Sequence, residues 1–253
     1  MGNVKQPLIT VVMPNYNGHR FVKQAIDSVL SQSYSNFELI VVDDHSKDDS
    51  LQLIRRKAQS DNRIRIIALE QNAGVANARN VGIMQAKGEY IALLDNDDMW
   101  VADKLKRQLA LAQKGADIVY CSYDFIDEQN NAIKKPFIVP PQADYNKMLA
   151  SNIIGCSTCF VKTELMQAHP FNPSFYHEDY VLWMELLQVC LVAYGDQQVL
   201  MHYRQVDGSR SNKKGNAAKE RWNVYRKALK LNLFTSTWAF VRYAVNGVIK
   251  YYL

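Results

Sequence analysis

Three clusters of acidic and amide side chains are the part of this sequence best suited to chemistry. They occupy residues 14–18 (Pro-Asn-Tyr-Asn-Gly), 43–46 (Asp-Asp-His-Ser) and 95–98 (Asp-Asn-Asp-Asp). Five carboxylates gathered in one place would repel one another unless a cation compensated them. Mg²⁺ or Mn²⁺ suits such an oxygen-only set, and a cation held by few carboxylates usually completes its shell with water and substrate phosphates. The clusters therefore predict a divalent metal and a di- or triphosphate ligand.

A purely structural role is the alternative for each cluster taken alone. Asp and Asn favour turns because their side chains bond their own backbone. Asp98 could cap a helix that starts near Val101. The position of all three clusters directly after apolar runs favours a shared site.

Short apolar runs alternate with amphipathic stretches over the first 125 residues, which predicts an α/β fold. The expected strands are 8–13, 37–42, 63–69, 90–94 and 117–123, and the expected helices are 22–30, 49–59, 75–87 and 101–114. This order predicts a mostly parallel, Rossmann-like sheet with helices on both faces. In such sheets ligands bind beyond the carboxyl ends of the strands, where the three clusters fall.

The pattern is weaker over residues 126–210. Pro136, Pro140 and Pro141 indicate a loop. Helices are expected over 144–151 and 181–189, and a strand over 198–204.

Composition limits the function classes. The 253 residues are 48% apolar and 22% charged, which is typical of a folded chain and not of a disordered one. Residues 1–7 contain no apolar run and no uncharged stretch of 18 apolar residues occurs, so we expect a cytoplasmic protein with reduced cysteines. Cys156 and Cys159 form a C-x-x-C pair, but they lack the second ligand pair or redox context that a functional role needs.

The ordered set of motifs resembles the family 2 glycosyltransferases with the GT-A fold, over about residues 8–210. The matching segments are 9–17, 28–33, 41–46, 72–74 with 78–82, 88–91, 94–100, 177–180 with Trp183, and 203–204. Residues 222–226 and the aromatic-rich stretch after them resemble transferases that build teichuronic-acid-type and capsular polysaccharides. The resemblance implies an enzyme that passes a hexose or N-acetylhexosamine from a UDP-sugar to a saccharide acceptor, with inversion.

The resemblance also implies how the nucleotide is held. Pro14 and Tyr16 would flank the uracil ring, and Asp44 would accept a hydrogen bond from it. Asp43 would support the loop. The remaining members of the nucleotide-binding set would be Arg79 beside the diphosphate and Asp95 on the ribose side, with the adjacent Asn96.

Metal binding and catalysis are implied in the same way. Asp97 would coordinate the Mn²⁺ or Mg²⁺ that bridges the phosphates, and Asp98 would position the loop or contact the sugar. Asp179 would be the base that removes the acceptor proton, with Glu178 as the fallback. These two acids could instead merely begin the helix expected at 181–189. Trp183 is expected to contact the substrate.

One position departs from the family pattern. Many relatives carry a histidine where this chain has Val206, and His202 lies out of register with it. Arg210, with Lys213 and Lys214, could instead close over the diphosphate, or could belong to a solvated basic loop.

The tail concentrates the positive charge. Residues 211–253 hold nine Lys or Arg and one acid, which leaves residues 1–210 with a net charge of −3. We therefore divide the chain into a catalytic domain, 1–210, and a basic, aromatic-rich helical segment, 211–253. A basic helix with Trp and Tyr suits peripheral contact with an anionic membrane; packing on the catalytic domain or a dimer contact are the alternatives. The resemblance to family 2 glycosyltransferases further implies an acceptor attached to a polyprenyl diphosphate at the inner membrane face.

Three other functions were weighed. A nucleotidyltransferase would need a Gly-rich phosphate loop with a basic residue, which residues 14–18 lack. A non-catalytic binding module is disfavoured by the intact Asp97 and Asp179. Nucleic-acid binding is suggested by the tail alone and has no accompanying motif, so no nucleic-acid partner is expected.

Overall fold

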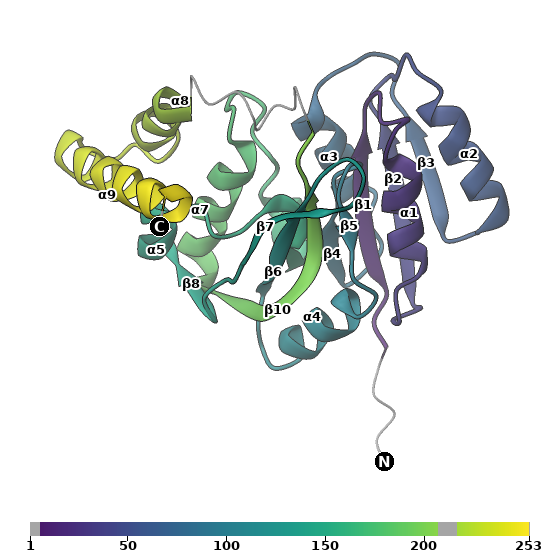
Figure 1. The fold of residues 1–253 in the computed structure, drawn as a ribbon, viewed down its shortest axis with the longest axis horizontal. Coiled ribbons are helices and arrows are strands. Elements are labelled where there is room, and N and C mark those ends of the chain that lie inside the picture. Colours follow the sequence, from purple (N-terminus) through teal and green to yellow (C-terminus); the bar gives the residue numbers. More distant parts are fainter. Residues whose placement is uncertain (1–5, 207–216, 253) are drawn as a thin grey trace.

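A single mixed β-sheet with helices on its faces organises the chain (Figure 1). The structure, a computed structural model, describes residues 6–206 and 217–252. The strand order is β3-β2-β1-β4-β9-β6-β10-β5, and β7 and β8 pair with β6 and β10. The α/β architecture with a helical tail expected from the sequence is thus observed.

The first half of the sheet is parallel. Its strands are β1 (Ile9–Asn15), β2 (Phe37–Asp43), β3 (Ile64–Ala68) and β4 (Tyr90–Leu93). Ile9 is in register with both Phe37 and Tyr90. All seven residues of β1 are buried, because helices cover both faces, and this explains its continuous apolar sequence.

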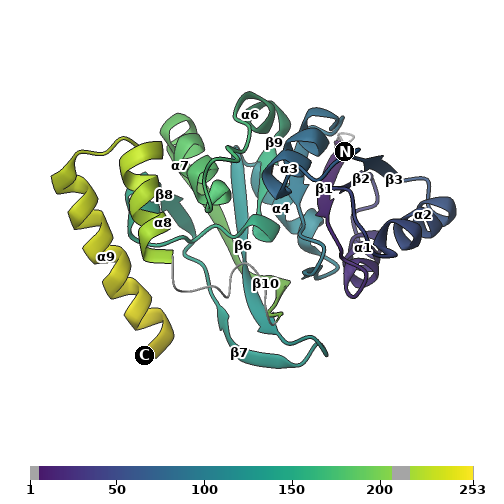
Figure 2. The same cartoon turned by 90° about the horizontal axis from the view of Figure 1, so that it is seen from above.

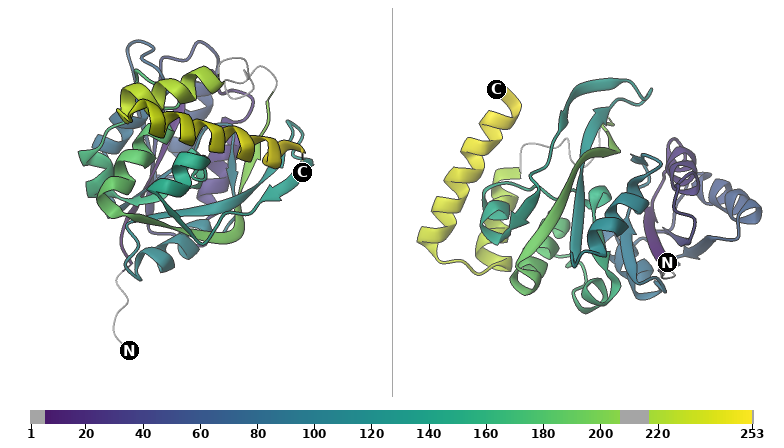
Figure 3. Two further views of the ribbon diagram at one scale, coloured as in Figure 1. Left: turned by 90° about the vertical axis from the view of Figure 1, so that its left-hand side faces the viewer. Right: turned by 90° about the horizontal axis from the view of Figure 1, so that it is seen from below.

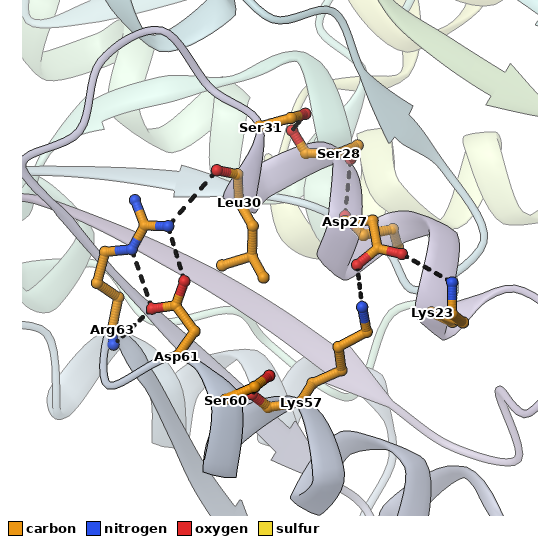
Figure 4. A network of polar contacts seen from close by, with 10 residues as sticks. Lys23, Asp27, Ser28, Leu30, Ser31, Lys57, Ser60, Asp61 and Arg63 are labelled. Atoms are coloured by element: carbon orange, nitrogen blue, oxygen red, sulfur yellow. Dashed lines mark hydrogen bonds and ion pairs between the residues drawn. The ribbon is translucent and has the colours of Figure 1, made fainter.

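The helices of this half are α1 (Val22–Leu30), α2 (Ser50–Ser60), α3 (Val75–Met84) and α4 (Lys104–Ala112). Surface ion pairs connect neighbouring elements, as Figure 4 shows. Lys57 of α2 bonds Asp27 of α1. Arg63 Nη2 lies 2.8 Å from Asp61 Oδ2 in the turn before β3. The Lys57–Asp27 contact joins α1 and α2, and the Arg63–Asp61 contact stabilises the turn that follows α2.

The second half is mixed where a mostly parallel sheet was expected. Its strands are β5 (Met99–Trp100), β6 (Ile118–Ile126), β7 (Ala132–Phe137), β8 (Gln142–Asp144), β9 (Phe160–Lys162) and β10 (Val192–Arg204). β9 runs antiparallel to both β4 and β6, and β10 runs parallel to β6. Consequently β1, β2, β4, β6 and β10 all point the same way, and their carboxyl ends share one edge.

Pro136 lies in a strand, where the sequence indicated a loop. It belongs to β7, which runs antiparallel to β6. Phe137 pairs with Tyr123 and Ala132 pairs with Ile126, and the register shifts between these two pairs. Proline lacks an amide hydrogen, so strands tolerate it at a sheet edge of this kind. β9 was also not predicted, since three residues carry no periodicity.

The remaining helices are α5 (Tyr145–Ala150), η1 (Cys156–Thr158), α6 (Thr163–Ala168) and α7 (Glu178–Cys190). Two large apolar clusters fill the interior. Cys121, Cys156 and Cys159 are buried free thiols, as expected of structural cysteines.

The tail comprises α8 (Ala217–Asn223), the π-helical turn η4 (Val224–Ala228) and α9 (Leu233–Tyr252). α8 and α9 lie together at one side of the molecule, beyond α7 (Figure 2). Val224, Tyr225 and Ala239 join the same apolar cluster as α7, and Tyr225 Oη donates to Leu149 O at 2.7 Å. One face of the tail is therefore packed on the catalytic fold. Within the described residues, no helix is long and apolar enough to cross a membrane.

Candidate active site

One amide side chain joins the loops that follow β1, β2 and β4. Asn15 Nδ2 donates to Asp43 Oδ1 at 2.7 Å and to Ser50 Oγ at 3.0 Å. Its Oδ1 accepts from Asn96 Nδ2 at 2.8 Å. The three polar clusters therefore lie at one edge of the sheet, as their positions after the strands predicted.

Gly18 completes this junction. A Cβ at Gly18 would lie 2.2 Å from Asn96 Nδ2 and 2.3 Å from Asn15 Oδ1. The close approach of loops from β1 and β4 thus requires glycine here, a requirement that the sequence alone did not reveal.

The carboxylates of Asp43 and Asp44, at the end of β2, accept hydrogen bonds from backbone amides. Asp43 is fully buried and accepts from Ser46 N at 3.0 Å, which fits the loop-supporting role implied for it. Asp44 accepts from Ala73 N and Gly74 N, both at 2.8 Å, so it ties its loop to the start of α3. Any nucleobase contact by Asp44 must use the remaining lone pairs of its carboxylate.

Of the two residues expected to flank the uracil ring, only Tyr16 has a side chain exposed to solvent. Its side chain is 48% exposed at the end of β1. Pro14 is buried within β1, opposite Val42. Tyr16 is therefore the ring available for stacking at this edge.

The acids after β4 have different surroundings. Burial, and then the charge of Asp95, raise the pKa of Asp97 to about 6. Burial and its acidic neighbours raise the pKa of Asp98 well above its usual value. Arg204 N donates to Asp98 Oδ1 at 3.0 Å and Arg204 Nε to Asp97 O at 2.8 Å. Asp98 thus fastens the loop to β10, and for Asp97 the effects of burial and Asp95 exceed those of the nearby Arg204 and Arg79.

Arg79 connects two parts of the site. Its guanidinium is buried, 2.6 Å from Asp95 Oδ1 and 2.9 Å from Glu178 Oε1. It also lies over the Phe171 ring at 5.3 Å. Burial disfavours its charged form, but Asp95 and Glu178 outweigh this and raise its pKa. The place beside the diphosphate implied for Arg79 stays a prediction; the contacts of its guanidinium within the chain are with these two carboxylates.

The two candidate bases, Glu178 and Asp179, are the first residues of α7, a position compatible with either interpretation. Glu178 is buried and ion-paired with Arg79. Asp179 is half-buried, and its Oδ1 accepts from Tyr180 N at 2.7 Å. Between the two, Asp179 is the carboxylate more open to an acceptor.

Trp183, which the sequence predicts to contact the substrate, lies in the protein core. Its side chain is fully buried and packs edge-on against Phe171 at 6.4 Å. Arg210, Lys213 and Lys214 lie outside the described residues. His202 pairs with Asp124 at 2.7 Å.

Ser157 was missed by the sequence analysis. Asp95 N donates to its Oγ at 3.0 Å, and Trp100 Nε1 donates to its carbonyl at 2.9 Å. Ser157 lies in η1, far along the chain from Asp95, and no local pattern marks it.

The acidic side chains of this site would bind a divalent metal only together with water and the phosphates of a bound substrate. Within the described ranges, no group of three or more His, Cys, Asp or Glu is arranged to hold a metal ion. The carboxylates of Asp97 and Asp95 are the candidate oxygen ligands, and oxygen ligands suit Mg²⁺ or Mn²⁺. A cation here would draw its other ligands from water and from substrate phosphates.

The fold and this acidic edge define a glycosyltransferase, and the chain belongs to that class: residues 10–162 match the family described as Glycosyl transferase family 2. The chain is 35% identical over 246 residues to the putative teichuronic acid biosynthesis glycosyltransferase TuaG of Bacillus subtilis, covering 97% of this chain and 98% of that protein. It is 34% identical to WfgD of Escherichia coli, a UDP-Glc:alpha-D-GlcNAc-diphosphoundecaprenol beta-1,3-glucosyltransferase, over 96% of this chain and 95% of WfgD.

Solved structures share the fold. TarS of S. aureus in complex with UDP-GlcNAc superposes with a TM-score of 0.75 at 19% identity, covering 96% of this chain and 73% of that one. The mannosyltransferase PcManGT of Pyrobaculum calidifontis, in complex with GDP-Man and Mn²⁺, superposes with a TM-score of 0.68 at 18% identity. The match covers 98% of this chain and 76% of that one. These likenesses establish the GT-A-like architecture.

Proposed function

We propose that this glycosyltransferase is an inverting, metal-dependent enzyme that transfers a hexose or N-acetylhexosamine from a UDP-sugar to a lipid-linked saccharide. It would extend a cell-surface polysaccharide at the inner face of the membrane, as a peripheral protein. The name of WfgD, with its UDP-Glc donor and diphosphoundecaprenol acceptor, supports this donor and this kind of acceptor.

The observation that carries the proposal is the chain of contacts across the site. Asn15 joins the loops of β1, β2 and β4. Arg79 then links Asp95 of the β4 loop to Glu178, the neighbour of Asp179. Donor-side and acceptor-side carboxylates are therefore fixed relative to each other, which in-line displacement requires.

Roles follow for the side chains. Tyr16 would stack on the uracil, and Asp44 would accept from its N–H. Asp97 would bind the cation, which when present orients the diphosphate and stabilises the charge of the leaving UDP. Asp179 would take the proton of the acceptor hydroxyl as that oxygen attacks the anomeric carbon. Glu178 and Arg79 are positioning residues.

The test is a screen of nucleotide-sugars for UDP release, with a lipid-linked N-acetylhexosamine acceptor and Mn²⁺ or Mg²⁺. We expect UDP-hexoses or UDP-N-acetylhexosamines to be used, and EDTA to abolish turnover until metal is restored. Activity that persists unchanged in EDTA would remove the metal from the proposal. Release of pyrophosphate from a sugar phosphate and UTP would favour a nucleotidyltransferase instead.

A further inference from the structure

Helix α9 is apolar on two opposite faces. Its inner face packs on the protein: Ser236 and Ala239 are fully buried, and Phe240 contacts Trp222 at 5.8 Å. Its outer face carries an α9 stripe, which we define as Phe234, Trp238, Val241 and Val245. The intervals of four, three and four residues place these side chains on one side of the helix.

The α9 stripe faces away from the rest of the chain. Phe234 is 84% exposed and Trp238 is 52% exposed. α9 forms the outermost element on its side of the molecule, with α8 and α5 on its inner side (Figure 3). An outer helical face is normally polar, and contiguous exposed apolar side chains indicate a surface that is covered in use.

Positive charge precedes the α9 stripe in the sequence and lies beside it at Arg242. Arg226, Lys227 and Lys230 are exposed just before Phe234, and the Arg242 guanidinium lies 4.5 Å from the Trp238 ring centroid. Glu220 is the only acid between residues 217 and 253. A two-fold dimer through this face would bring two equal cationic clusters together, which is unfavourable. An anionic lipid surface would pair them with phosphates.

We infer that the outer face of α9 docks on an anionic bilayer. Phe234 and Trp238 enter the boundary between headgroups and acyl chains, while the cations beside them contact lipid phosphates. This inference about the surface does not depend on the catalytic activity. The expectation that membrane binding gives access to a lipid-linked acceptor rests on the proposed function.

The inner contacts connect this surface to the active site. Arg221 of α8 lies between two rings, 3.7 Å from the Tyr180 centroid and 4.5 Å from that of Tyr243 on α9. Tyr180 follows Asp179 in α7. Docking through α9 therefore holds the helix that carries the proposed base at a fixed place relative to the bilayer.

The experiment is co-sedimentation of the full chain with vesicles, without donor or acceptor. We expect binding to phosphatidylglycerol-containing vesicles that weakens in neutral phosphatidylcholine and at high salt. The double variant Phe234→Glu with Trp238→Glu should lower the apparent partition coefficient by roughly tenfold or more. The matched control is Met84→Glu, because Met84 is 60% exposed on α3, away from α9 (Figure 2); its binding should not change.

Two outcomes would overturn the inference. One is equal vesicle binding by the double variant and the wild type, with both folded by circular dichroism. The other is a lipid-free wild-type dimer that the double variant converts to monomer in analytical ultracentrifugation, which would assign the stripe to a second copy. UDP binding measured on the same variants reports separately on the proposed function and should be unchanged.

Discussion

Arg79 and Glu178 form a buried ion pair of 2.9 Å between α3 and the first residue of α7, in which both side chains are almost inaccessible to solvent. The pair spans 99 residues of sequence. It fixes the start of α7, and hence Asp179, against the loop that carries Asp95. The site depends on this contact because the other groups lie on separate loops.

Breaking the Arg79–Glu178 ion pair should lower both the free energy of unfolding and the turnover rate. Arg79→Met leaves two carboxylates without their cation, and loss of one partner of a buried pair typically costs about 3–5 kcal/mol. We expect the free energy of unfolding in urea to fall by about that amount. Glu178→Gln keeps the shape and a hydrogen-bond acceptor, so it should lose less stability. A stable Arg79→Met protein with full turnover would contradict the positioning role.

Asp179→Asn should slow transfer strongly and leave donor binding unchanged. The amide has nearly the shape of the carboxylate but cannot accept the acceptor proton, and general-base catalysis contributes about 10²–10⁴-fold. We expect kcat to fall within that range, with the Kd for UDP unchanged in calorimetry. Glu185→Gln, further along α7, is the control and should keep its activity. Turnover near wild type in the Asp179 variant would place the base elsewhere.

Gly18→Ala should disturb the junction of the three loops. The added methyl would meet Asn15 and Asn96 at 2.2–2.3 Å, so one of these amides must move and their hydrogen bond is lost. We expect UDP affinity to fall by about tenfold, in line with the loss of about 1.4 kcal/mol.

Gly155→Ala is the matched control for Gly18→Ala. Its added methyl would lie 3.4 Å from Thr158 Cγ2, an ordinary contact. Its affinity for UDP should match the wild type. Equal loss in both variants would show that the junction has no special role.

Lys104→Met should stabilise the protein, and more so at neutral than at alkaline pH. Lys104 is fully buried and bonds Gln108 Oε1 at 2.6 Å, and burial lowers the pKa of its amine. Between this lowered pKa and the unfolded value of about 10.4, the unfolded chain binds more protons, so wild-type stability rises with pH. Methionine carries no charge and lacks this dependence.

The measurement for Lys104→Met is the difference in Tm from the wild type at pH 7 and at pH 9.5. We expect the advantage of the variant to shrink at the higher pH, and its loss of the contacts with Gln108 and Trp100 reduces that advantage at both. A difference in Tm that stays constant with pH would argue against a charged buried amine.

The sequence by itself determined the alternation of strands and helices, and with it the sheet edge at which the acids meet. Period and burial are local properties, so β1, β2 and β4 and the clusters after them were predictable from residues a few positions apart. The family motifs, which depend on the same local order, also pointed to the glycosyltransferase class.

Only the tertiary structure decided which side chains are free to act. Arg79, Glu178 and Trp183 look alike in sequence as candidate site residues, yet the fold pairs the first two and buries the third. Ser157 reaches Asp95 from η1, a distant segment placed beside β4 by the pairing of the three-residue strand β9, which carries no periodic signal. Contacts of this kind depend on how distant elements pack, and local sequence patterns carry no information about that packing.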